Sequence, residues 1–366
     1  MTAYAAQRFW VLDGMRGLAA ILVMQRHGPE FFGPEFGSTY LAVDMFFCLS
    51  GFVVASSYER RLQTGDLTGP VFLGLRLLRL WPLYLLAIVA MAVGALVVGR
   101  GVATESLILA ALYLPTPQSI GGNTALFPAL FVAWSLSWEI IANAAYGFTA
   151  RWLTNRILIG VLTLAFAGLV ATALHFGTLN VGFFWSGFLG GGARAVFAFF
   201  AGVLAYRLRP AERISNGWAI MVGLTTVLLM PGGAAYDLAA AAIVLPLLIH
   251  AASACRPSAK SAAVFAAAGA ASYPLYLLHF PAFRFGANIL GLHAGFASGL
   301  MLTAILLVGC WCVDRYLDRP LRRFLARQIP AFSPRKFSAT ASANAPPVTL
   351  RRLMRHEPAD TISTET

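Results

Sequence analysis

Residues 10–27 read WVLDGMRGLAAILVMQRH, an apolar stretch that nevertheless carries Asp13, Arg16 and His27. Charged groups inside a membrane span are costly, so proteins retain them mainly for function or for pairing helices. Arg16 and His27 are eleven residues apart, which on an α-helix is about 20° past three full turns and about 16 Å along the axis. One face of this helix is therefore predicted to present a cation near one end and a titratable imidazole near the other.

The whole chain has the composition of a membrane protein. Of its 366 residues, 58% are hydrophobic and only 11% are charged. A soluble domain carries about 25% charged residues because its surface must face water, so this composition excludes a soluble enzyme. The net charge is +12, but the basic residues are scattered between apolar stretches, which argues against a nucleic-acid partner.

Ten apolar stretches are long enough, or nearly long enough, to cross a bilayer. They cover residues 10–27, 38–56, 80–99, 134–150, 157–174, 193–206, 218–231, 237–251, 262–282 and 297–313. The sequence therefore predicts an all-α fold, a polytopic membrane helix bundle of about ten transmembrane helices. Residues 100–133 hold one short apolar stretch followed by several prolines and glycines, and they are predicted not to cross.

The positions of the Lys and Arg residues set the predicted orientation, because cytoplasmic loops are enriched in them. With ten spans and the N-terminus inside, all but five of the 27 Lys and Arg residues fall on the cytoplasmic side or in the C-terminal segment. The exceptions are Arg16, Arg26, Arg100, Arg194 and Arg284. Both termini are accordingly predicted to be cytoplasmic, in a multi-pass protein of the inner (plasma) membrane.

A change in composition near the C-terminus suggests two parts. Residues 1–328 are predicted to form the integral membrane domain. Residues 329–366 are polar and rich in Pro, Ser, Thr and Ala, which is typical of a disordered cytoplasmic tail. Cys310 and Cys312 form a C-x-C that lacks the spacing of a zinc half-site, so no metal is predicted.

Further ionisable side chains fall inside other predicted spans. In the ten-span topology Asp44, Glu139 and His279 lie toward the outer ends of their helices, at the depth of His27. We therefore expect these groups to converge around the imidazole, where they could transfer protons or orient the ring. The alternative is that each charged group forms a structural pair between helices.

Arg76 and Arg79 lie at i and i+3 on one face of a predicted helix, near its inner mouth. Guanidinium groups so placed suit an anionic phosphate ligand, although they could equally be cytoplasmic anchors. These residues alone suit an enzyme that takes an anionic cytosolic donor and acts toward the outer face, and they also suit a proton-coupled transporter. A transporter of a small anion or sugar is the alternative, but the inverted repeats typical of transporters are not visible.

Several motifs follow one another along the chain in a recognisable order. They are LDGMRGLAA at 12–20 followed by His27, VDMFFCLSGF at 43–52, RLLRLWPLY at 76–84, WSLSWE at 134–139 and SYPLYLLH at 272–279. These blocks resemble the acyltransferase-3 family of integral-membrane O-acyltransferases, whose first span carries an R-x10-H signature. One departure is Ile140, which stands where a second Glu is common in the family.

The resemblance implies transfer of an acyl group, usually acetyl, from cytosolic acyl-CoA to a hydroxyl of a sugar-containing acceptor. His27 would be the central catalytic residue, either as general base or as a transient acyl carrier. From their depth, Glu139 or Asp44 is predicted to fix the tautomer of His27, and both are counted with His27 as candidate catalytic residues. Contacts to donor or substrate are assigned to Arg16, Arg76, Arg79, Trp134, Ser137, Tyr273 and His279.

No bound cofactor is expected in this scheme, because acyl-CoA is a donor substrate. The expected partners are acyl-CoA, a carbohydrate or glycolipid acceptor and the lipid bilayer, and no oligomeric state follows from the sequence. Ser50-Gly51 lacks the G-x-S-x-G surroundings of a nucleophile elbow. We therefore expect Gly51 to permit close helix packing.

Overall fold

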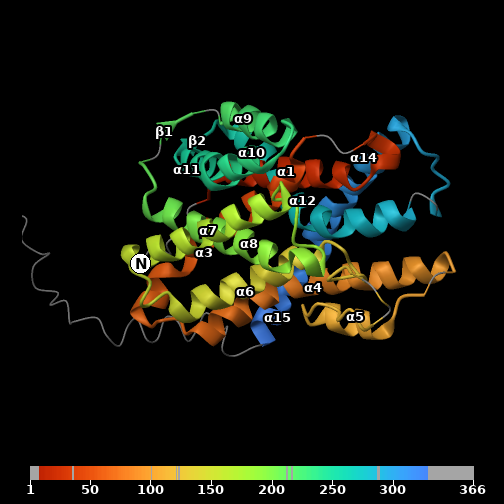
Figure 1. The fold of residues 1–366 in the computed structure, drawn as a ribbon. Helices are drawn as coiled ribbons and strands as arrows, with labels where there is room; N and C mark the ends of the chain where they lie inside the picture. Colours follow the sequence, from red (N-terminus) through yellow and green to blue (C-terminus); the bar gives the residue numbers. More distant parts are fainter. Residues whose placement is uncertain are drawn as a thin grey trace, which may run out of the picture.

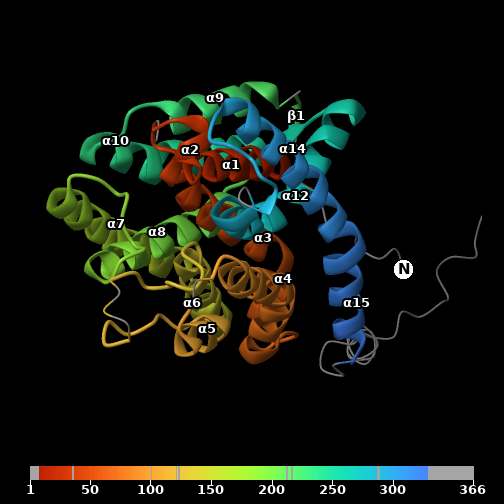
Figure 2. The ribbon, with the colours of Figure 1, turned by 90° about the vertical axis from the view of Figure 1, so that its right-hand side faces the viewer.

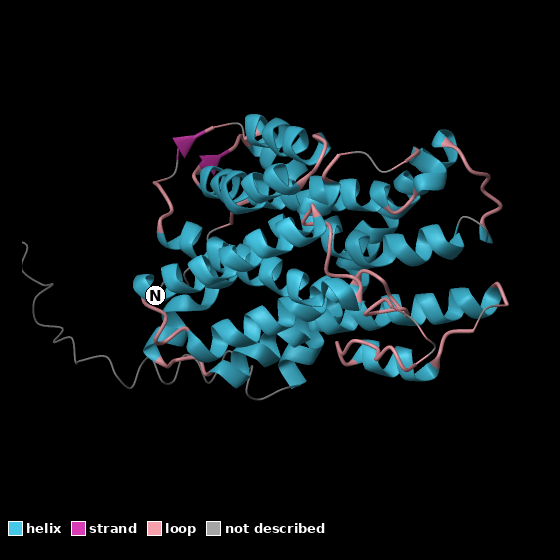
Figure 3. Cartoon of the chain, viewed as in Figure 1, coloured by secondary structure: helices cyan, strands magenta, loops and turns pink. Residues whose placement is uncertain are grey.

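Helices make up almost all of the regular structure, and each of the ten predicted spans coincides with one (Figures 1 and 3). The structure is a computed structural model that describes residues 8–328, apart from 35, 36, 100, 121, 123, 212, 216, 287 and 288. The predicted cytoplasmic tail, 329–366, lies outside the described residues.

The long helices of the bundle are α1 (Trp10–Arg26), α3 (Ala42–Thr64), α4 (Gly69–Val97), α6 (Ala133–Thr149), α7 (Asn155–Phe176), α8 (Phe188–Arg207), α9 (Trp218–Leu229), α12 (Ala259–Pro281) and α14 (Phe296–Cys312). A further helical segment joins α10 (Ala234–Ala239), the π-helical η3 (Ala240–Val244) and α11 (Leu245–Ser253). The short helices are α2 (Pro29–Phe32), η1 (Thr39–Leu41), α5 (Thr104–Ala111), η2 (Trp185–Gly187), η4 (Ala282–Gly286), η5 (Val313–Asp318) and α15 (Arg319–Gln328). Two-residue strands β1 (Arg213–Ile214) and β2 (Cys255–Arg256) pair in parallel.

The prediction of an all-α membrane bundle is confirmed. Within the described part of the chain, seven helical segments are long and apolar enough to cross a membrane. The other three predicted spans are shorter, since α1 and α6 each have 17 residues and α9 has 12. The protein is therefore a multi-pass membrane protein, while the count of ten crossings and the cytoplasmic termini stay predictions. Residues 100–132 hold only α5 and loops over the positions described, as expected, and α6 begins at Ala133.

The helices differ in how deeply they lie in the bundle. In the apolar stretches of α3 and α8, 78% and 72% of the residues are buried, against 28% in α7 and 17% in the segment that contains α14. On the outer helices large apolar side chains such as Leu164 and Leu174 are exposed, as lipid-facing side chains are. In Figure 2, α14, η5 and α15 form one continuous rod along the side of the bundle.

The central helices α3 and α8 cross in very close contact. A β-carbon on Gly51 would overlap the carbonyl oxygen of Phe199, and one on Gly202 would overlap that of Cys48. Only glycine lets the two backbones approach so closely, as small residues do at many membrane helix crossings. The prediction that Gly51 serves packing is confirmed.

A second close contact joins α1 to α12, and it positions the candidate site. A β-carbon on Gly17 would overlap Ala268, and one on Gly269 would lie 2.6 Å from the β-carbon of Asp13. Asp13 of α1 lies beside Gly269 of α12, and His27 at the C-terminal end of α1 lies beside His279 near the C-terminal end of α12. The two helices therefore run parallel. In the ten-span prediction these are spans one and nine, which cross in the same direction.

Replacing Gly51 by alanine is expected to destabilise the protein more than the same change at Gly160. The new methyl group at Gly51 must displace the backbone of α8, and overpacking of this kind costs about 1–3 kcal/mol or more. Gly160 lies on the exposed face of α7 with nothing within 4 Å of an added β-carbon. The midpoint of thermal unfolding of detergent-purified protein checks this, and equal midpoints for the two variants would contradict the tight crossing.

Candidate active site

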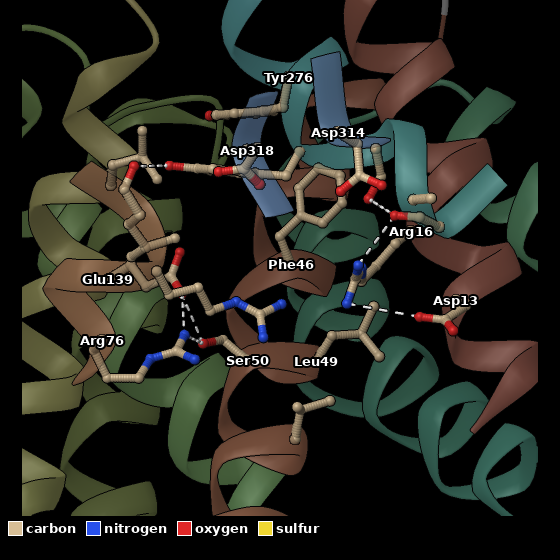
Figure 4. Close-up of a pocket in the computed structure, with 18 of the residues that line it drawn as sticks. Asp13, Arg16, Phe46, Leu49, Ser50, Arg76, Glu139, Tyr276, Asp314 and Asp318 are labelled. Carbon is tan, nitrogen blue, oxygen red and sulfur yellow. Dashed lines mark hydrogen bonds and ion pairs between the residues drawn. The ribbon is translucent and has the colours of Figure 1, made fainter. Parts of the chain in front are cut away.

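A cavity of about 270 Å³ lies between α1, α3, α4, α6, α12 and η5. We call it the arginine cavity, because arginines from three parts of the chain line it (Figure 4). The charged residues along its wall are Arg8, Asp13, Arg16, Arg76, Arg79, Glu139, Asp314, Asp318, Arg319 and Arg322. With six cations and four carboxylates, the wall carries a net positive charge, and it suits an anionic ligand.

One side of the cavity is formed by Arg76, Glu139 and Ser50. An Arg76 Nη2 atom lies 3.0 Å from Glu139 Oε1, and Ser50 Oγ donates a 2.8 Å hydrogen bond to the same oxygen. Arg76 is only 5% exposed, yet its Nε has no hydrogen-bond partner within the described residues. A buried N–H without a partner is costly, so this donor is suited to an acceptor atom of a ligand.

The opposite side is formed by Arg16 and Asp13 of α1 (Figure 4). Arg16 Nη2 donates a 3.1 Å hydrogen bond to the carbonyl oxygen of Gly269, and its Nη1 lies 3.8 Å from Asp13 Oδ1. Arg8 binds the other oxygen of Asp13 at 3.1 Å. Arg16 is therefore fixed at the edge of the cavity by the close packing of α1 on α12.

The π-helical η5 carries two further carboxylates to the cavity. Asp318 binds Arg322 at 2.7 Å, and Asp314 binds Arg319 at 2.6 Å. The i, i+4 spacing of Asp314 and Asp318 in this helical turn places both on the side that faces the cavity (Figure 4). Single π-turns of this kind are often found at functional sites.

At the other end of α1, His27 contacts His279 of α12. Their rings are 5.1 Å apart, and His279 Nε2 lies 3.3 Å from His27 Nδ1. His279 is fully buried, whereas His27 lines a second, more open pocket of about 470 Å³. We call this the histidine pocket, and its other lining residues are Pro29, Glu30, Phe31, Phe280, Phe283, Arg284, Leu292 and Ala294.

Tyr276 lies between the two sites. Its side chain lines the arginine cavity, and its ring centre is 6.2 Å from that of His279, one helical turn further along α12. The Tyr276 hydroxyl is 2.6 Å from Ser135 Oγ, and its ring packs edge-on against Phe46. Tyr276 therefore contacts both the arginine cavity and the histidine pair.

The predicted gathering of Asp44, Glu139 and His279 around His27 is correct for His279 alone. Asp44 forms a buried, bidentate ion pair with Arg194, with contacts of 2.6 and 3.1 Å. Glu139 faces the arginine cavity and binds Arg76 instead. The grouping was wrong because depth along a helix does not say toward which neighbour a side chain turns.

The residues expected to contact donor or substrate fall into three groups. Arg16, Arg76, Arg79 and Tyr273 line the arginine cavity. His279 joins His27 instead. Trp134 and Ser137 are not among the described residues that line the cavity: Ser137 donates to the Tyr113 carbonyl oxygen at 2.9 Å, and the ring of Trp134 lies under the guanidinium of Arg194.

The structure also adds residues that were not among the predicted catalytic and binding residues. Ser50 bridges Arg76 and Glu139, and Asp13, Asp314 and Asp318 balance the arginines. The i, i+4 spacing of the last two is a signal that could have been used. Within the described residues, no group of three or more His, Cys, Asp or Glu side chains is placed to hold a metal ion.

Comparison with known protein families matches residues 9–315 to the acyltransferase-3 family, described as an acyltransferase domain. Among curated proteins, "Protein 2 in picA locus" of Rhizobium radiobacter is 37% identical over 195 residues, which are 48% of this chain and all of that protein. No solved structure matches the chain. The fold and the family together define a multi-pass membrane acyltransferase. The chain belongs to the acyltransferase-3 family.

The contacts of Asp44 predict a structural effect of its removal. Replacing Asp44 by alanine leaves Arg194, which is 1% exposed, without its counter-charge, and this should cost about 3–5 kcal/mol of stability. The double replacement Asp44→Leu with Arg194→Met should recover most of that loss, because it removes both charges. Thermal unfolding of purified protein measures both effects.

An assay of acyltransferase activity distinguishes a structural role of Asp44 from a catalytic role. The double variant should remain active once it is folded. Loss of activity in a double variant of normal stability would show that Asp44 is needed for the chemistry.

Proposed function

We propose that this protein transfers an acyl group, with acetyl as the first expectation, from cytosolic acyl-CoA to a hydroxyl of a sugar-containing acceptor. The acceptor would be a cell-surface or exported polysaccharide or glycolipid, and the protein would act in the inner (plasma) membrane. The observation that carries the proposal is the two-ended arrangement along α1, with the arginine cavity at Arg16 and the histidine pair at His27.

The arginine cavity supports an acyl-CoA donor. Coenzyme A carries phosphate groups at one end and the thioester at the end of a long flexible arm. Arg76 and Arg79 would bind phosphate oxygens, because guanidinium groups bind them with charge-assisted, often bidentate hydrogen bonds. The unpartnered Nε of Arg76 is a suitable donor for one of these bonds. The arm would then extend past Tyr276 toward the histidines.

The histidine pocket supports a sugar acceptor. Phe31, Phe280 and Phe283 give it apolar aromatic faces, while Glu30 and Arg284 supply polar groups that can bind hydroxyls. Ligand pockets typically combine an apolar lining with a few polar groups that fix the orientation of the ligand. Entry of the acceptor from this end would keep donor and acceptor on different paths.

The proposed chemistry places His27 at the meeting point. The imidazole takes the proton of the acceptor hydroxyl while the hydroxyl oxygen attacks the thioester carbonyl carbon. The new C–O bond forms, the C–S bond breaks, and the departing thiolate takes the proton from His27 to give CoA-SH. An acyl-imidazole on His27 is the rival route, in which the imidazole attacks the thioester first.

Mass spectrometry of envelope glycans tests this function directly. Cells with the wild-type protein should carry an acyl modification that is lost in a deletion strain and in His27→Ala. His175→Ala is the matched control, because His175 is exposed at the end of α7 and outside both pockets, and it should retain the modification. Identical glycans in all four strains would contradict acylation of a surface glycan.

A further inference from the structure

The contact between His27 and His279 assigns the protons of both rings. His27 Nδ1 lies 2.8 Å from the carbonyl oxygen of Val23, and His279 Nδ1 lies 2.9 Å from that of Leu275. A carbonyl oxygen has no proton to donate, so each Nδ1 must carry the hydrogen of its bond. In the neutral rings, the unprotonated nitrogen is therefore Nε2 of each histidine.

The donor and the acceptor of the hydrogen bond between the two rings then follow from these protons. Nε2 of His279, 3.3 Å away, accepts from the Nδ1–H of His27, which is shared with the Val23 carbonyl oxygen. His279 cannot donate along this contact without a second proton, and it is fully buried among apolar and aromatic side chains, where a charged ring would be costly. The two helices thus hold His27 with Nδ1 protonated and Nε2 as the basic nitrogen.

We propose that His279 is a positioning residue for His27. It fixes the tautomer and the ring orientation of His27, and it stabilises the imidazolium that forms when His27 Nε2 takes a proton from the acceptor hydroxyl. The proposal rests on the general-base function proposed above. The proton that arrives at Nε2 later leaves to the CoA thiolate, while the Nδ1 proton stays between Val23 and His279 throughout.

A neutral partner suits this place in the protein. A carboxylate beside His27 would need its own counter-charge and hydrogen bonds in an apolar region. Asp44 and Glu139, the carboxylates that the sequence predicted beside His27, are already paired with Arg194 and Arg76. An imidazole anchored to a backbone carbonyl accepts the hydrogen bond without introducing a charge.

The other charged or titratable groups near His27 come from separate elements. Glu30 of α2 and Arg284 of η4 line the same pocket, and Arg26 precedes His27 on α1. The charges of these groups contribute to the electrostatic potential at the His27 imidazole. They are left unchanged in the variants below, so differences between variants report on His279.

Two substitutions at His279 separate positioning from packing. His279→Gln retains an amide oxygen that can accept near the place of Nε2, whereas His279→Phe retains a ring but no acceptor. Each full-length variant is compared with wild type in membrane vesicles at equal protein amounts. The assay follows transfer of label from [14C]acetyl-CoA to the endogenous membrane glycan as a function of pH.

We expect His279→Phe to lower kcat about 10- to 100-fold, the effect of losing one hydrogen bond to a charged group. The KM for acetyl-CoA should be unchanged, and the acidic limb of the pH profile should move to lower pH, because protonated His27 has lost an acceptor. His279→Gln should retain kcat within about threefold of wild type, since a neutral acceptor of similar strength remains.

Other outcomes overturn one proposal or the other. If wild type transfers label and His27→Ala does not, but both His279 variants keep the wild-type kcat and pH profile, the positioning role is wrong. It is also wrong if both variants lose activity to the same extent, which indicates a packing role. If His279→Phe does not accumulate, a His279→Gln variant with much reduced kcat rejects the proposal. Equal labelling in wild type and His27→Ala rejects the proposed function itself.

Discussion

The close parallel packing of α1 on α12 is the constraint on which the candidate site depends. Gly17 and Gly269 let the two backbones approach until a single β-carbon would overlap the neighbouring helix. The same approach brings Arg16 to the Gly269 carbonyl oxygen at one end and His27 to His279 at the other. The cation and the imidazole of one helix are thus held at a fixed separation by a second helix, and larger residues in this contact would disturb both ends together.

The hydrogen bonds that a buried arginine makes distinguish a structural arginine from a candidate binding arginine. Arg194 donates hydrogen bonds to Asp44 and to the carbonyl oxygens of Val181 and Tyr40, so its role is to join α3, α8 and the loop at Val181. Arg76 is buried almost as deeply but keeps one donor without a partner among the described residues. An arginine in a structural ion pair and an arginine that could bind a ligand therefore look alike in the sequence. The number of N–H donors that already have a partner distinguishes the two in the structure.

Much of this arrangement could be predicted from the sequence, but not the pairing of charges. Each of the ten stretches chosen by hydropathy coincides with a helical segment, and helical periodicity placed Arg16 and His27 at opposite ends of one wall. Depth along a span could not say that Glu139 turns toward Arg76, because that depends on the rotation of α6 against α4. The sequence indicates Ser50 only as the neighbour of a packing glycine. Its hydrogen bond to Glu139 joins residues 89 positions apart, and no local pattern predicts such a contact.

In the proposed function, donor and acceptor reach His27 from opposite ends of α1. Sealed membrane vesicles of both orientations, given membrane-impermeant [14C]acetyl-CoA, test it most directly. We expect inside-out vesicles to label their glycan at once, and right-side-out vesicles to do so only after permeabilisation. Equal labelling of intact vesicles in both orientations, or labelling confined to the right-side-out ones, would contradict it.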